Sequence, residues 1–200
     1  MTIAFPDENF RSYVLMHFVK NIDGVITEEE ALSVKKVYLA FEKSISSLEG
    51  IQYFKNLEIL ECYNFTYHQL TTLDVSKNTA LTTLECYENQ LTTLDVSKNT
   101  SLTTLNCGYN QLTTLDVSGC PALTELRCQN NQLTTLDVSG CTALTALWCG
   151  GNQLTTLDVS KNTSLTELQC PVTLKTLYLK SGQTIQHLSR VLNTEIVYID

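Results

Sequence analysis

The chain has 200 residues, of which 21 are acidic and 13 basic, and its formal net charge is −8. This balance argues against partners that require clustered Lys and Arg, such as nucleic acids and anionic membranes. No apolar run approaches the roughly 20 residues of a membrane span. Three prolines and eight glycines leave little room for a long flexible linker, so we expect one domain or one repeat array.

Residues 1–33 are predicted to form a helical N-terminal cap. Apolar Phe10, Val14 and Phe18 recur at helical spacing after a proline and several acidic residues, which indicates a first helix. A second, shorter helix is expected through Ala31.

The segment between these helices resembles an EF-hand loop. In the register of that loop, Asn21, Asp23 and Glu30 fall on ligand positions and Gly24 falls on the sharp turn. Val19 occupies the first ligand position, however, and has no side-chain oxygen. We therefore expect a structural cap and keep a calcium site at Asn21, Asp23 and Glu30 as the alternative. No cofactor and no other metal is predicted.

Residues 34–170 are predicted to form a repeat array, because the central part of this segment repeats with a period of 21 residues. Each unit has the frame L-x-x-L-x-C-x-x-N-x-L-T-T-L-D-V-S. The recurring residues include Leu84, Leu105, Leu126, Leu147 and Leu168, and also Asn89, Asn110, Asn131 and Asn152. A fixed period in the twenties with this frame is the mark of a leucine-rich repeat.

A single unit of this length cannot bury its own apolar face, but stacked copies can, because each leucine meets the same leucine above and below. The L-x-x-L-x-C half predicts a short strand that pairs in parallel with its neighbours. The second half should return along the convex side. Val34, Val37 and Leu39 fit a first, less regular strand, and an insertion at residues 63–69 predicts a bulged loop beside the concave face.

The eight cysteines are predicted to be reduced. Six of them occupy one inward strand position in successive units: Cys62, Cys86, Cys107, Cys128, Cys149 and Cys170. Like residues on neighbouring parallel strands point the same way, which is poor disulfide geometry, and cysteine packs as a small apolar residue. Cys120 and Cys141 replace asparagines of the sibling units and are expected to be turn residues, with a bond between them as the alternative.

A column of aspartates accompanies the turn of each unit. It consists of Asp74, Asp95, Asp116, Asp137 and Asp158. We expect each to bond the backbone of its own turn, with a ladder of bound cations as the alternative. Mutual repulsion along the column should raise the pKa values of these carboxyl groups.

Residues 171–200 are predicted to form a small capping unit. Leu174, Leu177 and Leu179 indicate a further strand, 184–192 a short helix, and 195–199 a closing strand. This unit would cover the exposed end of the array, where an unpaired strand edge promotes aggregation.

The concave face carries the candidate binding residues. The convex text L-T-T-L-D-V-S is identical in all copies, whereas the outward strand positions differ from copy to copy. Aromatic residues and arginine are typical of interaction surfaces, and a group of glutamates would favour a basic partner patch. The predicted partner-binding residues are Glu61, Tyr63, Glu85, Tyr87, Glu88, Asn106, Tyr109, Arg127, Gln129 and Trp148. Neutral drift on a fixed scaffold is the alternative.

No catalytic residues are predicted. His17, His68 and His187 lie in the cap, the inserted loop and the tail, and none is spaced to pair with a repeated cysteine or aspartate. We therefore expect a protein that is not an enzyme.

The repeat text Leu-Thr-Thr-Leu-x-Cys-x-x-Asn-Gln-Leu-Thr-Thr-Leu-Asp-Val-Ser, together with the helical cap, resembles the leucine-rich repeat region of bacterial internalins. The resemblance covers roughly residues 5–180. It implies a curved α/β repeat fold, a right-handed solenoid with a concave parallel sheet and a cap at each end.

The same resemblance implies a secreted or surface-displayed module that binds a protein or glycan, including one from a host. A monomer is expected. Met1 runs directly into Thr-Ile-Ala-Phe-Pro-Asp without a signal-peptide pattern, so the chain is either cytosolic or a mature segment with an added Met. The alternative function is a structural spacer with no specific ligand.

Overall fold

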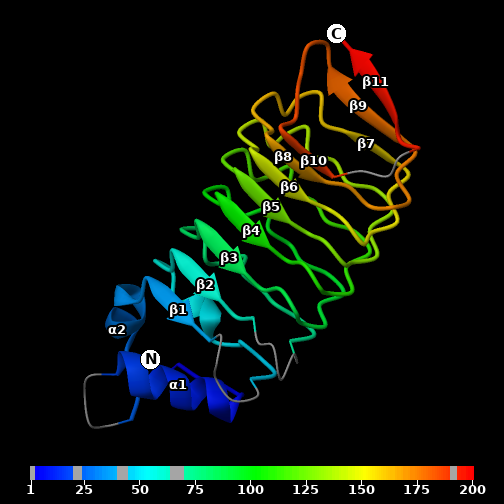
Figure 1. Cartoon of the computed structure of the whole chain (residues 1–200). Coiled ribbons are helices and arrows are strands. Elements are labelled where there is room, and N and C mark those ends of the chain that lie inside the picture. The colour runs from blue at the N-terminus through cyan, green and yellow to red at the C-terminus, as the bar shows by residue number, and fades with distance from the viewer. Residues whose placement is uncertain (1–2, 20–23, 40–44, 64–69, 190–192) are drawn as a thin grey trace.

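The computed structural model describes residues 3–19, 24–39, 45–63, 70–189 and 193–200, and it confirms the predicted leucine-rich repeat solenoid. Eight short parallel strands form one sheet along the length of the molecule, and the return segments run behind them (Figure 1). In spatial order the strands are β1 (Lys36–Tyr38), β2 (Ile59–Glu61), β3 (Thr83–Glu85), β4 (Thr104–Asn106), β5 (Glu125–Arg127), β6 (Ala146–Trp148), β8 (Glu167–Gln169) and β10 (His187–Ser189).

The register of the sheet places like residues side by side. Leu84 lies opposite Leu60 and Leu105, and the same column continues through every later strand. These leucines and the cysteines of the array are almost completely buried. Fully burying one leucine contributes about 1.5–3 kcal/mol, so the column of identical residues is the main source of stability between coils.

All eight cysteines are buried, and the described residues contain no disulfide, as predicted. Burial raises the pKa of the thiols from Cys62 to Cys149, for example that of Cys107 to about 12. A thiol with a raised pKa stays protonated at neutral pH and reacts slowly, because the thiolate is the nucleophile. The cysteine column therefore acts as core.

One ladder of asparagines holds the bend after each concave strand. The Asn110 amide nitrogen donates to the carbonyls of Cys86 (3.0 Å) and Cys107 (3.1 Å), while its oxygen accepts from the Leu91 amide (3.0 Å). Asn89, Asn131 and Asn152 repeat this pattern. Each asparagine thus satisfies backbone groups of two coils that would otherwise be buried without partners.

A second ladder lies on the opposite side of the coils and includes two of the cysteines. Asn99 donates to the carbonyls of Val75 (3.1 Å) and Asn78 (2.9 Å). The Cys120 sulfur takes the equivalent place in the next coil, 3.6 Å from the Val96 oxygen. The whole ladder consists of Asn78, Asn99, Cys120, Cys141, Asn162 and Gln183. The prediction that Cys120 and Cys141 are turn residues is confirmed.

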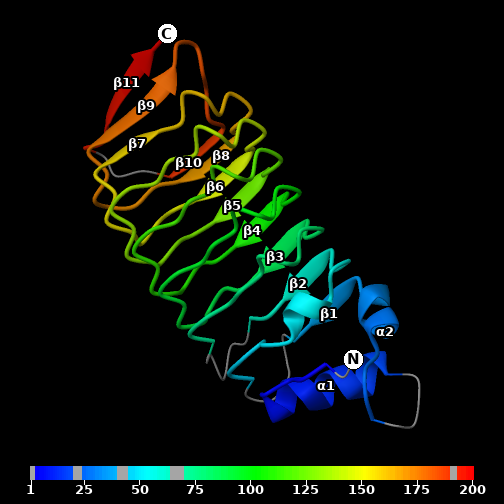
Figure 2. The same cartoon turned by 180° about the vertical axis from the view of Figure 1, so that it is seen from behind.

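Two helices cover the N-terminal end of the stack, where the sequence predicts them (Figures 1 and 2). Helix α1 (Glu8–Phe18) begins at Asp7, whose carboxylate accepts from two backbone amides of the first turn. Helix α2 (Glu28–Ser33) begins with a capping box between Thr27 and Glu30. Phe10 packs edge-on against Phe5, with ring centroids 5.4 Å apart, and seals the apolar end of the array.

The calcium candidates are only partly visible in this cap. Asn21 and Asp23 lie outside the described residues. The Glu30 carboxylate accepts from the Thr27 amide and hydroxyl, both at 2.9 Å. The predicted loop at 63–69 also lies outside the described residues, apart from Tyr63.

The C-terminal region differs from the prediction. The expected helix over 184–192 is wrong at His187–Ser189, which form strand β10 beside β8 in the concave sheet. Strand β9 (Thr176–Lys180) instead pairs with β7 (Thr156–Asp158) on the return side, and β11 (Glu195–Ile199) pairs with β9 as predicted for the closing strand. The chain makes one more turn of the solenoid, because pairing with an existing strand outweighs a short helical pattern. The boundaries of the two caps remain predictions.

The aspartate column also corrects an expectation. Hydrogen bonds from the serine two residues later lower the pKa of Asp74, Asp95, Asp116 and Asp137 instead of raising it. Repulsion from a neighbouring aspartate raises the pKa of Asp74, Asp116 and Asp137, but it is weaker than these local bonds. Because the carboxylates face solvent, water screens the repulsion.

Candidate functional site

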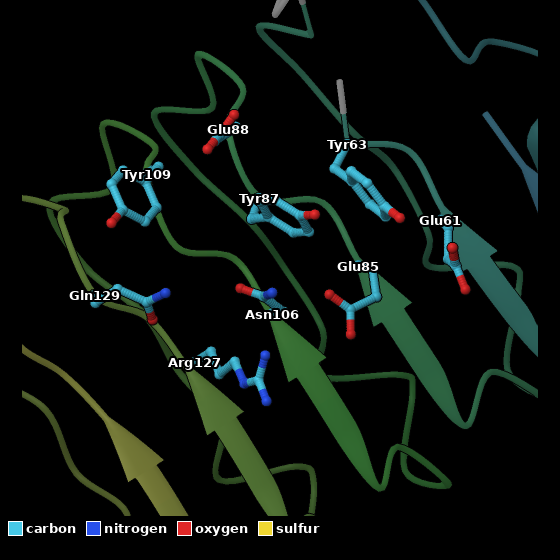
Figure 3. A pocket seen from close by; sticks show the side chains of 9 residues that line it. All are labelled: Glu61, Tyr63, Glu85, Tyr87, Glu88, Asn106, Tyr109, Arg127 and Gln129. Carbon is cyan, nitrogen blue, oxygen red and sulfur yellow. The ribbon is translucent and has the colours of Figure 1, made fainter. Parts of the chain in front are cut away.

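A groove of about 430 Å³ runs along the N-terminal half of the concave sheet. We call it the concave groove and define it by its nine lining residues: Glu61, Tyr63, Glu85, Tyr87, Glu88, Asn106, Tyr109, Arg127 and Gln129. Figure 3 shows their side chains converging from four neighbouring coils. All nine are among the ten residues that the sequence analysis selected.

The strand pattern explains why these side chains face outward. In each three-residue strand the central leucine is buried and its two neighbours point to the concave side. The register then places Glu61, Glu85 and Asn106 in one row, which Arg127 continues. Because packing constrains only the central leucine of each strand, the outward positions that form this row can hold different polar residues.

The corner after each strand adds side chains above this row. Glu88, Tyr109 and Asn130 have φ values of 54°, 53° and 53°, and Gly151 has the same left-handed backbone with φ 65°. The amides at this corner bond the next coil, as in Tyr109 to the Gln129 oxygen at 2.8 Å. A residue with a side chain other than Asn or Asp costs about 1 kcal/mol or more in this conformation. The groove therefore contains two strained corner residues, Glu88 and Tyr109.

Two tyrosines form one wall of the groove. The rings of Tyr63 and Tyr87 stack with centroids 4.3 Å apart and an angle of 18° between their planes. Burial, and next to it the neighbouring Tyr63, raises the pKa of Tyr87. The stacked pair presents a flat aromatic surface with polar ends.

Glu85 lies on the floor of the groove. Its side chain is half-buried, and burial raises its pKa, while a hydrogen bond from Asn106 and the charge of Arg127 act in the opposite direction. Asn106 is itself only 5% exposed and lies beside this carboxylate on the next strand (Figure 3). The described residues include no ion pair to Glu85.

Arg127 connects the groove to Trp148. Its Nε lies 2.6 Å from the Glu125 carboxylate, and its guanidinium lies over the indole of Trp148 at 4.5 Å from the ring centroid. Trp148 lines a second hollow of about 510 Å³ with residues of β8 and β10. Of the ten predicted residues, Trp148 alone is outside the concave groove, and it adjoins the groove through Arg127.

Sequence analysis missed two parts of this surface. Glu125, which pairs with Arg127, occupies a column that is threonine or alanine in neighbouring coils. This departure from the repeat was the available signal. Gln186 and His187 line the second hollow, but the tail was expected to be helical, so it was not counted as concave.

We also searched the described residues for a metal site, an available histidine and a membrane-spanning helix. Among those residues no group of three or more His, Cys, Asp or Glu side chains could hold a metal ion. His17 bonds the Tyr13 carbonyl at 2.9 Å and stacks on the Tyr13 ring. No helix within the described ranges is long and apolar enough to cross a membrane.

Comparison with known proteins gives one consistent result. A family model described as leucine-rich repeats (2 copies) matches residues 121–190. Internalin J of Listeria monocytogenes serotype 4b (strain F2365) is 45% identical over 75 residues. This match covers 38% of the present chain and 8% of that protein.

Solved structures show the same fold over nearly the whole chain. The functional domain of internalin J from Listeria monocytogenes, which includes a cysteine ladder, superposes with a TM-score of 0.80 at 35% identity. That superposition covers 98% of the present chain and 45% of the solved one. Internalin C2 of Listeria monocytogenes matches in fold, with a TM-score of 0.57 at 20% identity over 98% and 94% of the two chains. The present chain thus spans less than half of the internalin J domain that it resembles.

Proposed function

The chain is a leucine-rich repeat protein of the internalin type, and from this premise we propose that it is a non-catalytic interaction module that binds its partner in the concave groove. The partner is a protein or a glycan, including one from a host. By likeness to internalins, the module acts outside the cell, either secreted or on the surface.

The observation that carries this proposal is a difference between the equivalent corners of successive coils. Glu88 and Tyr109 adopt a left-handed backbone that glycine adopts freely, as Gly151 does in a later coil. Selection for stability alone favours glycine or asparagine there. Two strained residues side by side in one groove point to side chains that are kept for contact with a partner.

The groove also has the composition of a recognition surface. It combines three tyrosines with one arginine and several amide and carboxylate groups. Tyrosine and arginine supply large contact areas together with hydrogen bonds, and they dominate the energetics of protein interfaces. A polar, open groove of this kind suits a partner surface better than a small buried ligand.

Saturable binding of the purified chain to immobilised host-cell or mucus extracts tests the proposal. We expect the variant Tyr87→Ala/Tyr109→Ala to lose binding while its melting temperature stays close to that of the wild type. The matched control is Tyr198→Ala, which removes a tyrosine that is 57% exposed on β11, far from the groove.

Two outcomes would contradict the proposal. Full binding by the double variant would place recognition elsewhere on the molecule. Absence of saturable binding by the wild-type chain would favour the alternative, a structural spacer without a specific ligand.

A further inference from the structure

We propose that the concave groove receives a lysine or arginine side chain from an exposed basic segment of a partner protein, seated against Tyr87 and beside Glu85 and Glu61. This inference rests on the proposed function and specifies the chemistry of the partner at the same site.

The charge of the groove is the first argument. Its lining contains three glutamates, Glu61, Glu85 and Glu88, against one arginine. That arginine already has two partners, since Glu125 lies 2.6 Å from its Nε and Trp148 stacks under its guanidinium, and its charge offsets only part of the acidic groups of the groove. The groove therefore keeps a negative potential at its N-terminal end, within a chain whose net charge is already −8.

The position of Glu85 is the second argument. Its carboxylate is half-buried and oriented by Asn106, and no cation within the described residues is paired with it. A partly desolvated carboxylate gains more from an incoming cation than one in open water, because less of its hydration must be removed. Asn106 leaves the outer side of this carboxylate directed into the groove (Figure 3).

The aromatic wall is the third and independent argument. Tyr63 and Tyr87 are stacked, so their shared stack presents a π face to the groove beside the carboxylates. A guanidinium or ammonium group binds over such a face by cation–π attraction. Gln129 adds a side-chain oxygen that is buried without a hydrogen-bond donor, and a guanidinium offers five N–H donors.

Other ligand classes fit less well. A sulfated or sialylated glycan would bring negative charge to Glu61 and Glu85 and would be repelled. A neutral sugar could stack on the tyrosines but would bring no positive charge to Glu61 and Glu85. A basic peptide segment satisfies the ring face and the carboxylates at once.

Fluorescence anisotropy with the full chain provides the test. The probes are a labelled Gly-Ser-Arg-Gly-Arg-Ser-Gly peptide and the same peptide with citrulline in place of each arginine. Citrulline keeps the shape and loses the charge. We expect the arginine peptide to bind at least about tenfold more tightly than the citrulline peptide, and its affinity to fall when salt rises from about 50 to about 300 mM.

Two variants with the same change of charge localise the effect. Glu85→Gln should weaken the arginine peptide about tenfold, whereas Glu167→Gln, on the same sheet but outside the groove, should change affinity less than about twofold. Glu85→Gln keeps the size of the side chain and removes a partly buried charge, so it should fold, and its melting temperature verifies this.

The proposal is overturned if both peptides bind equally, if neither binds, or if Glu167→Gln weakens binding as much as Glu85→Gln does. A neutral oligosaccharide that binds where the arginine peptide fails also overturns it. In each of these cases the proposed function survives if an extract component still binds and Tyr87→Ala/Tyr109→Ala removes that binding. The two failures are therefore distinguishable.

Discussion

The buried ladders and the concave groove occupy the same coils but follow opposite rules. At the ladder positions, one coil repeats the residues of the next: leucine on leucine, cysteine on cysteine, asparagine on asparagine. In the groove, the row of Glu61, Glu85, Asn106 and Arg127 changes from acidic through neutral to basic along successive strands. Stability thus depends on identical residues in successive coils, whereas the proposed recognition depends on residues that differ, and the two sets alternate along one strand.

The corner after each strand is subject both to the backbone geometry of the coil and to the side-chain composition of the groove. Its backbone is fixed by bonds to the next coil, yet its side chain lies at the rim of the groove. Gly151 and Asn130 follow the requirement of the backbone, whereas Glu88 and Tyr109 do not. The following substitutions separate the two requirements.

The largest effect is expected from the leucine column. Leu105 is fully buried between Leu84 and Leu126, so Leu105→Ala leaves a cavity that neighbouring coils cannot close. We expect a loss of about 3 kcal/mol in the free energy of unfolding, measured by urea denaturation. The adjacent Thr104→Ala, on the opposite face of the same strand, should cost less than about 0.5 kcal/mol. Equal losses would show that the two faces are not energetically distinct.

An exchange within the second ladder should stabilise the chain. Cys120 occupies the ladder position that Asn99 occupies one coil earlier. Asn99 donates two hydrogen bonds, of 3.1 and 2.9 Å, whereas the Cys120 sulfur lies 3.6 and 3.8 Å from the Val96 and Asn99 oxygens. Cys120→Asn should therefore raise the free energy of unfolding by at most about 1 kcal/mol, because the new amide oxygen would be buried without a donor, as that of Asn99 is, and this offsets part of the gain. Binding to the concave groove should be unchanged. A destabilised variant would indicate that the Cys120 coil is packed too tightly for the amide.

The corner offers a trade between stability and binding. Tyr109→Gly removes the left-handed strain and should raise the free energy of unfolding by up to about 1 kcal/mol, although it removes a half-exposed groove side chain and should weaken partner binding. Asn130→Gly, at the same corner one coil further on, should give a smaller gain, because asparagine tolerates this backbone. Calorimetry measures the stability of both variants, and the binding assay measures their affinity for the partner. A Tyr109→Gly variant less stable than the wild type would contradict the proposal that the Tyr109 backbone is strained.

Gly151→Ala tests the same corner in the opposite direction. The added Cβ would collide with the Asn130 side-chain oxygen while the backbone stays left-handed. Melting temperature should fall in this variant.

The smallest effect concerns pH. Serine hydrogen bonds hold the pKa of Asp95 and Asp116 below the ordinary value of 3.8 in the folded chain. A lowered folded pKa gives stabilisation that is present above the unfolded pKa and is lost as the pH falls through the folded value. The urea midpoint should therefore decline below about pH 4, and less so in Asp95→Ala/Asp116→Ala. An identical decline in both proteins would assign the acid sensitivity to other carboxylates.

The array could be read from sequence because its information is local and repeated. A leucine in a given phase has one possible environment, so the register of β3, β4, β5, β6 and β8 follows from the 21-residue period. The same logic selected nine residues that meet in one groove, since outward positions in neighbouring coils must be adjacent.

The failures arise where the period weakens or where two effects of similar size compete. Ile185 and Leu188 have helical spacing locally, yet Leu188 lies 20 residues after Leu168 and pairs with it in the sheet. For the aspartates, charge repulsion and serine hydrogen bonds oppose each other, and only the geometry of the turn shows that the bonds are stronger. The contact between Arg127 and Trp148 depends on side-chain rotamers, which spacing does not specify.

Like-on-like register has one more consequence. Removal of the 21-residue unit from 112 to 132 would bring Gln111 before Leu133, reproducing the Gln-Leu junction that precedes every return segment. Leu91, Leu112 and Leu133 occupy equivalent positions in successive coils. The core would therefore contain the same packing at the new junction as at every other one. Unequal exchange within the gene can therefore lengthen or shorten the array by one 21-residue coil at a time, in frame and without a new kind of junction in the core. The area of the concave face can change in this way while the buried ladders stay the same.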